Sequence, residues 1–215
     1  MIKTKLEKKM SIISIREITP HVGKTDQLIG RVKRAADIMS RHGSQVAVST
    51  VVVGDGAGDI HMYGLYPDCT VAAKSFQSFS KDPEMVSLSQ ERETNPAGEM
   101  RGPLLARLIY GSTPGTPKPV SVQRDYHMSR SNIRSVLEMA PGLEKLMKSI
   151  EVEVAVGVPL ITSDHEMIRV MYRFSSMDHW GESVDFMLNS EEFTKILAKA
   201  SSLGTLKKSR LISRI

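Results

Sequence analysis

The side chains best able to do chemistry in this sequence fall on short stretches in which polar and apolar residues alternate. They comprise two histidines that can carry a proton near neutral pH, two arginines that can hold a carboxylate or an enolate, and three hydrogen-bonding side chains. The candidate catalytic residues are His61 and His127, and the candidate binding residues are Arg16, Tyr63, Gln123, Asp125 and Arg169. Together they predict a site for an anionic or phenolic small molecule.

A second interpretation of the same seven side chains involves no chemistry. They can form a satisfied polar network between two sheets, or face water. The assignment to one face also depends on register, because a one-residue slip moves every side chain of a strand to the other face. The sequence leaves both interpretations open.

Strand alternation places these side chains. In residues 166–174 the alternate positions are apolar, which predicts one face against helices and the other face open. The residues of the open face are Met167, Arg169, Met171 and Arg173, and the matching residues of 60–66 are His61, Tyr63 and Leu65. In the two opening strands, the residues predicted to face helices are Ile13, Ile15, Val120 and Val122. The residues left on the open face are Ser14, Arg16, Ser121, Gln123, Asp125 and His127.

These strands belong to a pattern of order βαββαβ. Its predicted elements are a strand at 11–18, a helix from 25 to about 42, hairpin strands at 45–53 and 60–66 around the Gly/Asp-rich turn 54–59, helices at 71–79 and from 82, and a strand at 104–110. The turn joins strand to strand, so it does not match a phosphate loop, which needs a following helix.

The pattern then repeats after residues 111–119, which hold three prolines and two glycines and read as a linker. The predicted elements are a strand at 120–126, a helix at 132–148 interrupted near Pro141-Gly142, hairpin strands at 152–158 and 166–174, helices at 183–188 and 191–200, and a strand at 210–215. An offset of 108 superimposes Ile60 on Ile168 and Tyr66 on Phe174. The predicted fold is α+β, with ferredoxin-like repeats at 11–110 and 120–215 after a basic extension at 1–10.

Composition excludes several classes. The formal net charge is +5, but the first ten residues and four cations from Lys207 onward carry the excess, leaving residues 11–206 at about −2. No basic patch and no aromatic RNA-binding motif is visible, so no nucleic-acid partner is expected. The apolar stretch after residue 10 is too short for a signal segment or a membrane span, and the single Cys69, expected to be a buried, unreactive thiol, indicates a reducing, cytoplasmic setting.

A family resemblance rests on markers in the first repeat. These are Val22-Gly23-Lys24-Thr25-Asp26, a long helix ending at His42-Gly43, the stretch Tyr66-Pro67-Asp68, and Lys81-Asp82-Pro83-Glu84. The sequence resembles NIPSNAP-like members of the dimeric α/β-barrel superfamily over residues 11–110, and more faintly over 119–215. The resemblance implies that the two antiparallel sheets pair as a barrel. It does not imply a function, because the superfamily includes cofactor-independent monooxygenases, haem-degrading enzymes, isomerases and proteins without known activity.

Three functions remain open. The first is an enzyme without metal or other cofactor, acting on a small carbonyl-bearing or aromatic molecule in the barrel. The second is a non-catalytic protein that binds a small molecule or assembles as a homo-oligomer. The third is a haem-binding or haem-degrading protein, which needs an axial histidine directed into a roomy pocket.

Overall fold

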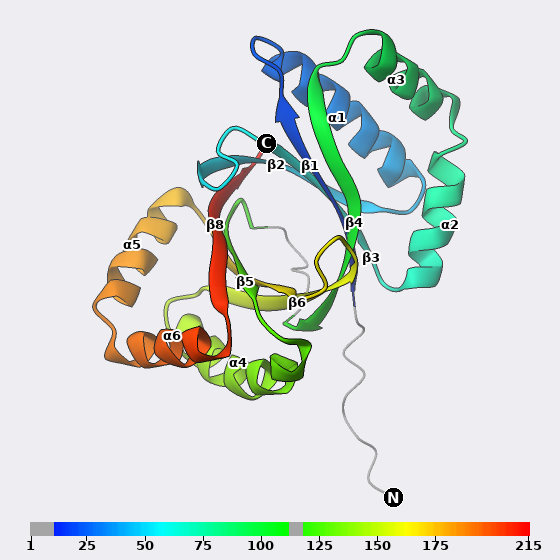
Figure 1. Ribbon diagram of the computed structural model, residues 1–215. Helices are drawn as coiled ribbons and strands as arrows, with labels where there is room; N and C mark the ends of the chain where they lie inside the picture. Colours follow the sequence, from blue (N-terminus) through cyan, green and yellow to red (C-terminus); the bar gives the residue numbers. More distant parts are fainter. Residues whose placement is uncertain (1–10, 112–117) are drawn as a thin grey trace, which may run out of the picture.

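The computed structural model describes residues 11–111 and 118–215. The predicted extension 1–10 and residues 112–117 of the predicted linker lie outside the described residues. Eight strands close into a barrel, with α1, α2 and α3 against one side and α4, α5 and α6 against the other (Figure 1).

Each half of the chain contributes four strands. The first half contains β1 (Ile12–Pro20), α1 (Thr25–Arg41), β2 (Gln45–Gly54), β3 (Ile60–Tyr66), α2 (Cys69–Phe79), α3 (Pro83–Thr94) and β4 (Gly98–Tyr110). The second half contains β5 (Val120–His127), the 3₁₀ turn η1 (Arg130–Asn132), α4 (Ile133–Lys148), β6 (Glu153–Ile161), β7 (Met167–Phe174), α5 (Met177–Leu188), α6 (Glu191–Leu203) and β8 (Thr205–Arg214).

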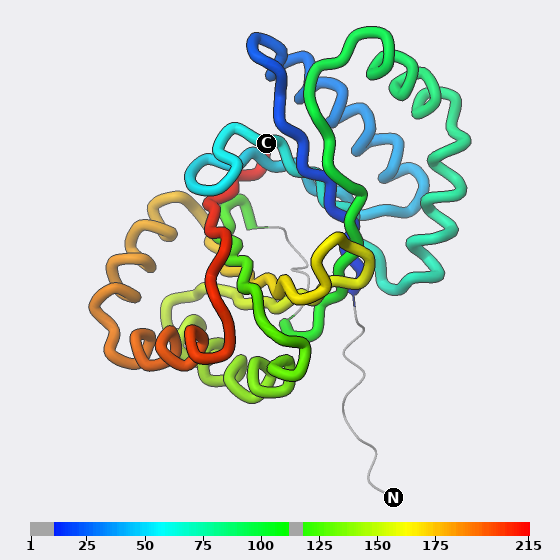
Figure 2. Tube along the Cα trace, viewed as in Figure 1, coloured from blue at the N-terminus to red at the C-terminus, as the bar shows by residue number. Residues whose placement is uncertain are grey.

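The strand order around the barrel is β1-β3-β2-β8-β5-β7-β6-β4. Within it, β4-β1-β3-β2 and β8-β5-β7-β6 have the same order, which is that of a ferredoxin-like sheet. The two sheets join through antiparallel β2–β8 and β4–β6 pairs, and Figure 2 shows the last strand between the two halves. The predicted α+β class and paired repeats are confirmed, and the barrel closes within one chain.

Side-chain caps set the helix starts. The Asp68 carboxylate accepts a hydrogen bond from the Val71 N–H at 2.8 Å and starts α2, and the Ser176 hydroxyl accepts from the His179 N–H at 3.0 Å and starts α5. The second cap explains why the helix predicted at 183–188 begins earlier, at Met177. Trp180 therefore lies inside α5 and packs partly buried on the core.

The interruption predicted near Pro141-Gly142 is wrong, because α4 runs unbroken from Ile133 to Lys148. A proline inside a helix removes one backbone hydrogen bond. Pro141 and Gly142 are exposed, whereas Ala140 and Leu143 are buried, so water can solvate the carbonyl that loses its partner while the opposite face stays packed.

The helices cover the outer face of each sheet. Ile18, Met39, Ile60 and Met62 are central to the core under α1, and Met147, Tyr172 and Phe174 to the core under α4, α5 and α6. The expectation of a buried thiol is wrong, because Cys69 is exposed at the first position of α2. Over residues 11–111 and 118–215, no helix is long and apolar enough to cross a membrane.

Candidate functional site in the barrel interior

A cavity of about 600 Å³ lies inside the barrel, and all eight strands contribute residues to its wall. Small-molecule sites fall in the same range of volumes. A barrel with eight strands is wide enough to hold one small ligand only if its interior side chains leave room. Here they do, so the interior is open rather than packed solid.

One wall of the cavity is apolar and comes mainly from the first half of the chain. Its residues pack together as an interior core distinct from those under the helices. They are Ile13, Ile15, Tyr63, Leu65, Leu104 and Ala106, joined by Met171 of β7 and backed by the buried Leu108 and Ala155. This wall can bury the hydrocarbon part of a ligand.

The rest of the wall carries a buried network of ion pairs that draws on both halves of the chain. Asp125 accepts a two-pronged pair of hydrogen bonds from Arg169, with Nε to Oδ1 at 2.6 Å and Nη2 to Oδ2 at 2.8 Å. Arg210 bridges the two halves of the chain, donating to Asp125 at 2.9 Å and to Glu17 at 3.0 Å. Arg101 reaches the same Glu17 at 3.2 Å.

This network holds its charges at neutral pH. Burial by itself would raise the pKa of Asp125, but the hydrogen bonds from Arg169 and the charge of Arg210 outweigh it and lower the pKa. Burial likewise opposes ionisation of Glu17, and the charges of Arg169 and Arg210 again lower the pKa. Paired in this way, the carboxylates are positioning groups for the arginines rather than free bases.

A second polar chain crosses the barrel beside the first. The Gln123 amide donates to the Tyr63 hydroxyl at 2.9 Å, and that hydroxyl lies 2.8 Å from His61 Nδ1. His61 is fully buried behind the cavity wall. Burial lowers the pKa of His61 to about 4, with Glu17 only partly opposing the shift, and burial raises the pKa of Tyr63 to about 12. Both side chains are therefore neutral near pH 7.

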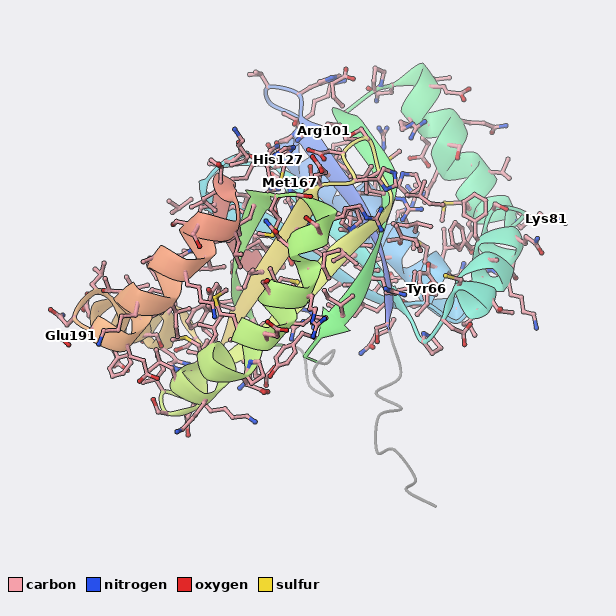
Figure 3. The ribbon with its side chains drawn as sticks, turned by 60° about the horizontal axis from the view of Figure 1, so that its bottom comes forward. Tyr66, Lys81, Arg101, His127, Met167 and Glu191 are labelled. Atoms are coloured by element: carbon pink, nitrogen blue, oxygen red, sulfur yellow. The ribbon has the colours of Figure 1, made fainter. Side chains whose placement is uncertain are left out.

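The cavity reaches both ends of the barrel. At one end, called here the Arg101 end, β4 begins and the β6–β7 hairpin turns; the labelled Arg101, His127 and Met167 lie near one another there (Figure 3). The other end, called the Arg214 end, is lined by Lys118, Arg173 and Arg214.

The structure brings together most of the predicted site. Tyr63, Gln123, Asp125 and Arg169 line the cavity, and His61 lies directly behind Tyr63. The open face predicted for β7 is also found, since Met167, Arg169, Met171 and Arg173 all line the cavity. Whether any of these residues acts on a ligand stays a prediction.

Arg16 does not reach the cavity, and the predicted facing of β1 is wrong. Arg16 pairs with Met62 of β3, which packs under the helices, and residues directly opposite in a sheet share a face. Ile13, Ile15 and Glu17 face the interior instead. Alternation failed because β1 is buried on both faces from Ile12 to Ile18, so apolar residues occupy both.

His127 stands at the rim and does not line the cavity. Its Nε2 lies 3.6 Å from a Glu166 oxygen and 3.9 Å from an Asp164 oxygen, and 44% of its side chain is exposed. It therefore belongs to a half-exposed ion-pair cluster on the hairpin. The two predicted catalytic histidines are not brought together.

Sequence reasoning missed Glu17, Arg101 and Arg210. The last of these was assigned to a basic tail, but β8 is an interior strand in which Lys208, Arg210 and Arg214 line the cavity. The signal was present. Arg210, Ile212 and Arg214 share one face of the predicted final strand, whereas Leu211 lies on the other face and packs under the helices. Assigning Leu211 to the helix-facing core would have placed the cations inside.

Comparisons with known proteins define the fold. No protein-family model matches the chain, and no curated protein sequence matches it. Solved structures do. A candidate monooxygenase from Lactobacillus acidophilus aligns with a TM-score of 0.64 at 8% identity, covering 95% of this chain and 94% of its own. An anthrone oxidase-like protein aligns at 0.63 with 11% identity over 97% and 92%, and a candidate chlorite dismutase at 0.61 with 9% identity over 96% and 95%.

At these identities the likeness shows the fold alone, which is that of the dimeric α/β-barrel proteins, with its two repeats in one chain. The likeness extends over the whole chain rather than one repeat.

The residues present do not fit a histidine-ligated haem in this cavity. Haem iron needs an axial ligand such as histidine, and none of the six histidines lines the cavity. His61 is buried against Tyr63, and His179 of α5 is held on both ring nitrogens, by the Ile150 carbonyl at 2.7 Å and the Ser175 N–H at 3.1 Å. In the part of the chain that the structure describes, no cluster of His, Cys, Asp and Glu is arranged to hold a metal ion.

Proposed function

We propose that the barrel interior binds one small, largely apolar or aromatic molecule that carries a phenol or carbonyl oxygen. The observation that carries this proposal is the cavity of about 600 Å³ whose wall has an apolar part and a hydrogen-bonding part. The apolar wall would bury the rings, which provides most of the binding free energy. The polar wall would fix their orientation.

Gln123 supports the choice of a hydroxyl-bearing ligand. Its amide donates to Tyr63 while its Oε1 has no hydrogen-bond partner among the described residues. A buried acceptor left without a donor is costly. Oε1 has almost no exposed surface, so a ligand hydroxyl would supply that donor after the Gln123 amide turns toward the cavity. A carbonyl oxygen would instead accept from Arg101, which lines the same cavity.

The catalytic part of the proposal is proton handling without a cofactor. His61 does not touch the cavity, so it would act through Tyr63. The proton lost by the ligand would pass to the Tyr63 oxygen while the Tyr63 hydroxyl proton passes to Nδ1 of the neutral His61. Arg101 or Arg169 would stabilise a phenolate or enolate. The name of one structural neighbour, an anthrone oxidase-like protein, supports an aromatic substrate. The proposal also includes a NIPSNAP-like relationship and a division of the chain into repeats at 11–110 and 120–215. It further includes a homo-oligomeric assembly and a cytoplasmic setting.

Binding of 2-naphthol, followed by calorimetry, tests it. Ala106→Trp fills the apolar side of the cavity and should weaken binding at least about tenfold, whereas Ala198→Trp adds the same bulk to the exposed face of α6 and should change nothing. Equal affinity in both variants, with thermal unfolding showing that both fold, would place the ligand elsewhere and refute the proposal.

Gln123→Leu sharpens the test. Loss of one hydrogen bond should weaken 2-naphthol by roughly 3- to 10-fold and leave 2-methylnaphthalene, which has no hydroxyl, unaffected. A variant that weakens both ligands equally would show that Gln123 shapes the cavity without recognising the oxygen.

A further inference from the structure

The cations inside the barrel fall into two groups with different surroundings. Seven of them line the cavity: Arg101, Lys118, Arg169, Arg173, Lys208, Arg210 and Arg214. Only three carboxylates do so, those of Glu17, Asp125 and Asp164. The cavity wall in the described residues therefore carries an excess of positive charge.

All three carboxylates lie toward the Arg101 end. Glu17 and Asp125 bind Arg169 and Arg210 within the ion-pair network. Asp164 lies in the hairpin turn that follows β6, close to His127. Lys208 has its own partner, because its Nζ lies 3.3 Å from an Asp55 oxygen. The cations of this end are therefore largely compensated.

Among the residues that the structure describes, the Arg214 end has three cations and no carboxylate in its part of the wall. The sheet gathers them from neighbouring strands: the Arg214 N–H donates to the Pro119 carbonyl at 2.8 Å, which places Arg214 next to Lys118, and Arg173 stands opposite Ser121 of β5. Arg173 lies 3.9 Å from a Glu153 oxygen, and Glu153 is outside the cavity lining.

The two buried arginines of β7, one toward each end of the cavity, differ in the direction of their pKa shifts. Burial opposes the charge of both, but the hydrogen bonds from Arg169 to Asp125 outweigh it and raise the pKa of Arg169. For Arg173, burial prevails over the attraction of Glu153 and lowers the pKa. An anion placed beside Arg173 would offset that cost of burial.

We infer that the Arg214 end is an anion subsite of the cavity, at which Arg173, Arg214 and Lys118 bind a carboxylate carried by the ligand. Because a single cavity joins this end to the apolar wall and to Gln123, the ligand class is an aromatic acid. Its rings lie against the apolar wall, its carboxylate points to the Arg214 end, and its phenol oxygen points to Gln123. This inference rests on the proposed function and adds the substituent and the direction in which the ligand lies.

A matched pair of ligands tests the subsite separately from the cavity. The probes are 6-hydroxy-2-naphthoate and its methyl ester, which share the rings and the phenol and differ by one negative charge. At pH 7 and low salt the acid should bind at least about tenfold more tightly than the ester, and added salt should reduce this advantage because exposed charges are screened.

Three variants locate the charge. Arg214→Gln and Arg173→Gln should each remove most of the advantage of the acid, whereas Lys208→Gln, a cavity cation at the opposite end, should preserve it. Arg214 is exposed, so its variant should fold even if Arg173, whose side chain is only 12% exposed, proves necessary for folding.

The outcomes separate the two proposals. If the acid and the ester bind with equal affinity and Ala106→Trp weakens both, the cavity binds aromatic ligands but the anion subsite is refuted. If Lys208→Gln reduces the preference as much as Arg214→Gln does, the preference is a general charge effect and the subsite is again refuted. If neither probe binds and Ala106→Trp leaves the affinity for 2-naphthol unchanged, the proposed function itself fails.

Discussion

The two halves of the chain have the same order of strands and helices, yet they make opposite walls of the same cavity. The first half contributes mostly apolar side chains to the interior, such as Ile15, Leu65 and Leu104, with Glu17 and Arg101 as its charged contributions. The second half contributes Gln123, Asp125 and a series of cations. Two copies of one sheet can therefore build a two-sided site, because each copy has only one wall to supply.

The division also shows where the stability of the barrel resides. The apolar wall gains free energy from burial, whereas the polar wall is stable only while its charges stay paired. Arg210 connects the two, since it joins Glu17 of the first half to Asp125 of the second. Substitutions in the two walls should therefore destabilise the chain for different physical reasons.

The largest effect is expected at Asp125. Asp125→Ala leaves Arg169 and Arg210 buried without their main partner, and breaking a buried pair in this way costs about 3–5 kcal/mol. Urea unfolding monitored by circular dichroism measures it. Glu138→Ala, which removes the exposed i,i+4 pair with Arg134, is the control and should cost less than about 0.5 kcal/mol. A small loss for Asp125→Ala would show that the polar wall does not need its charges paired.

The apolar wall should respond through its packing. Leu108 is 4% exposed and lies behind the cavity, whereas Leu188 on α5 is 76% exposed. Leu108→Ala should lower the free energy of unfolding by about 2–5 kcal/mol, and Leu188→Ala should leave it nearly unchanged. Similar losses for the two variants would contradict the assignment of Leu108 to the interior core.

A smaller effect, confined to a pH range, is expected at His61. Its pKa is about 4 in the folded chain, against about 6.5 for an ordinary histidine. Between these values the unfolded chain binds a proton that the folded chain does not. The free energy of unfolding therefore loses nothing to His61 above pH 6.5. On acidification toward pH 4 it falls by an amount on the order of 2–3 kcal/mol.

His61→Leu should flatten this part of the stability curve, measured by urea unfolding at several pH values. His165→Leu, at an exposed position of the β6–β7 turn, should leave the curve unchanged. An unaltered slope in His61→Leu would mean that another group gives the chain its sensitivity to acid in this range. The carboxylates Glu17 and Asp125, whose pKa values are lowered, act at still lower pH, because their contribution is lost as pH falls through the folded pKa.

The sequence predicted the architecture well and the interior less evenly, for a physical reason. In a strand with one more polar and one apolar face, such as β7, alternation predicts which face is directed to the interior, and Arg169 was placed correctly. β1 is buried on both faces, so Arg16 and Glu17 could not be distinguished by alternation. His127 was placed on the correct face by its parity, but alternation does not show how far along the barrel a residue lies, and it ends at the rim.

Contacts that cross the barrel were beyond the reach of local patterns. Glu17 and Arg210 are 193 positions apart, and only the closed order of strands brings them together. The same holds for Tyr63 and Gln123, which are 60 positions apart. Periodicity identifies which face a side chain occupies, but the partner across the barrel depends on how the two sheets join.

The position of β8 has a consequence for how the molecule is made. This strand hydrogen-bonds to β2 on one side and to β5 on the other, and it follows both of them along the chain. Until it arrives, β2 and β5 are unpaired edges on a nascent chain, and such edges can pair with other chains. The wall of the cavity is therefore incomplete until the ten residues of β8 pair, and the chain depends on their quick pairing to avoid aggregation.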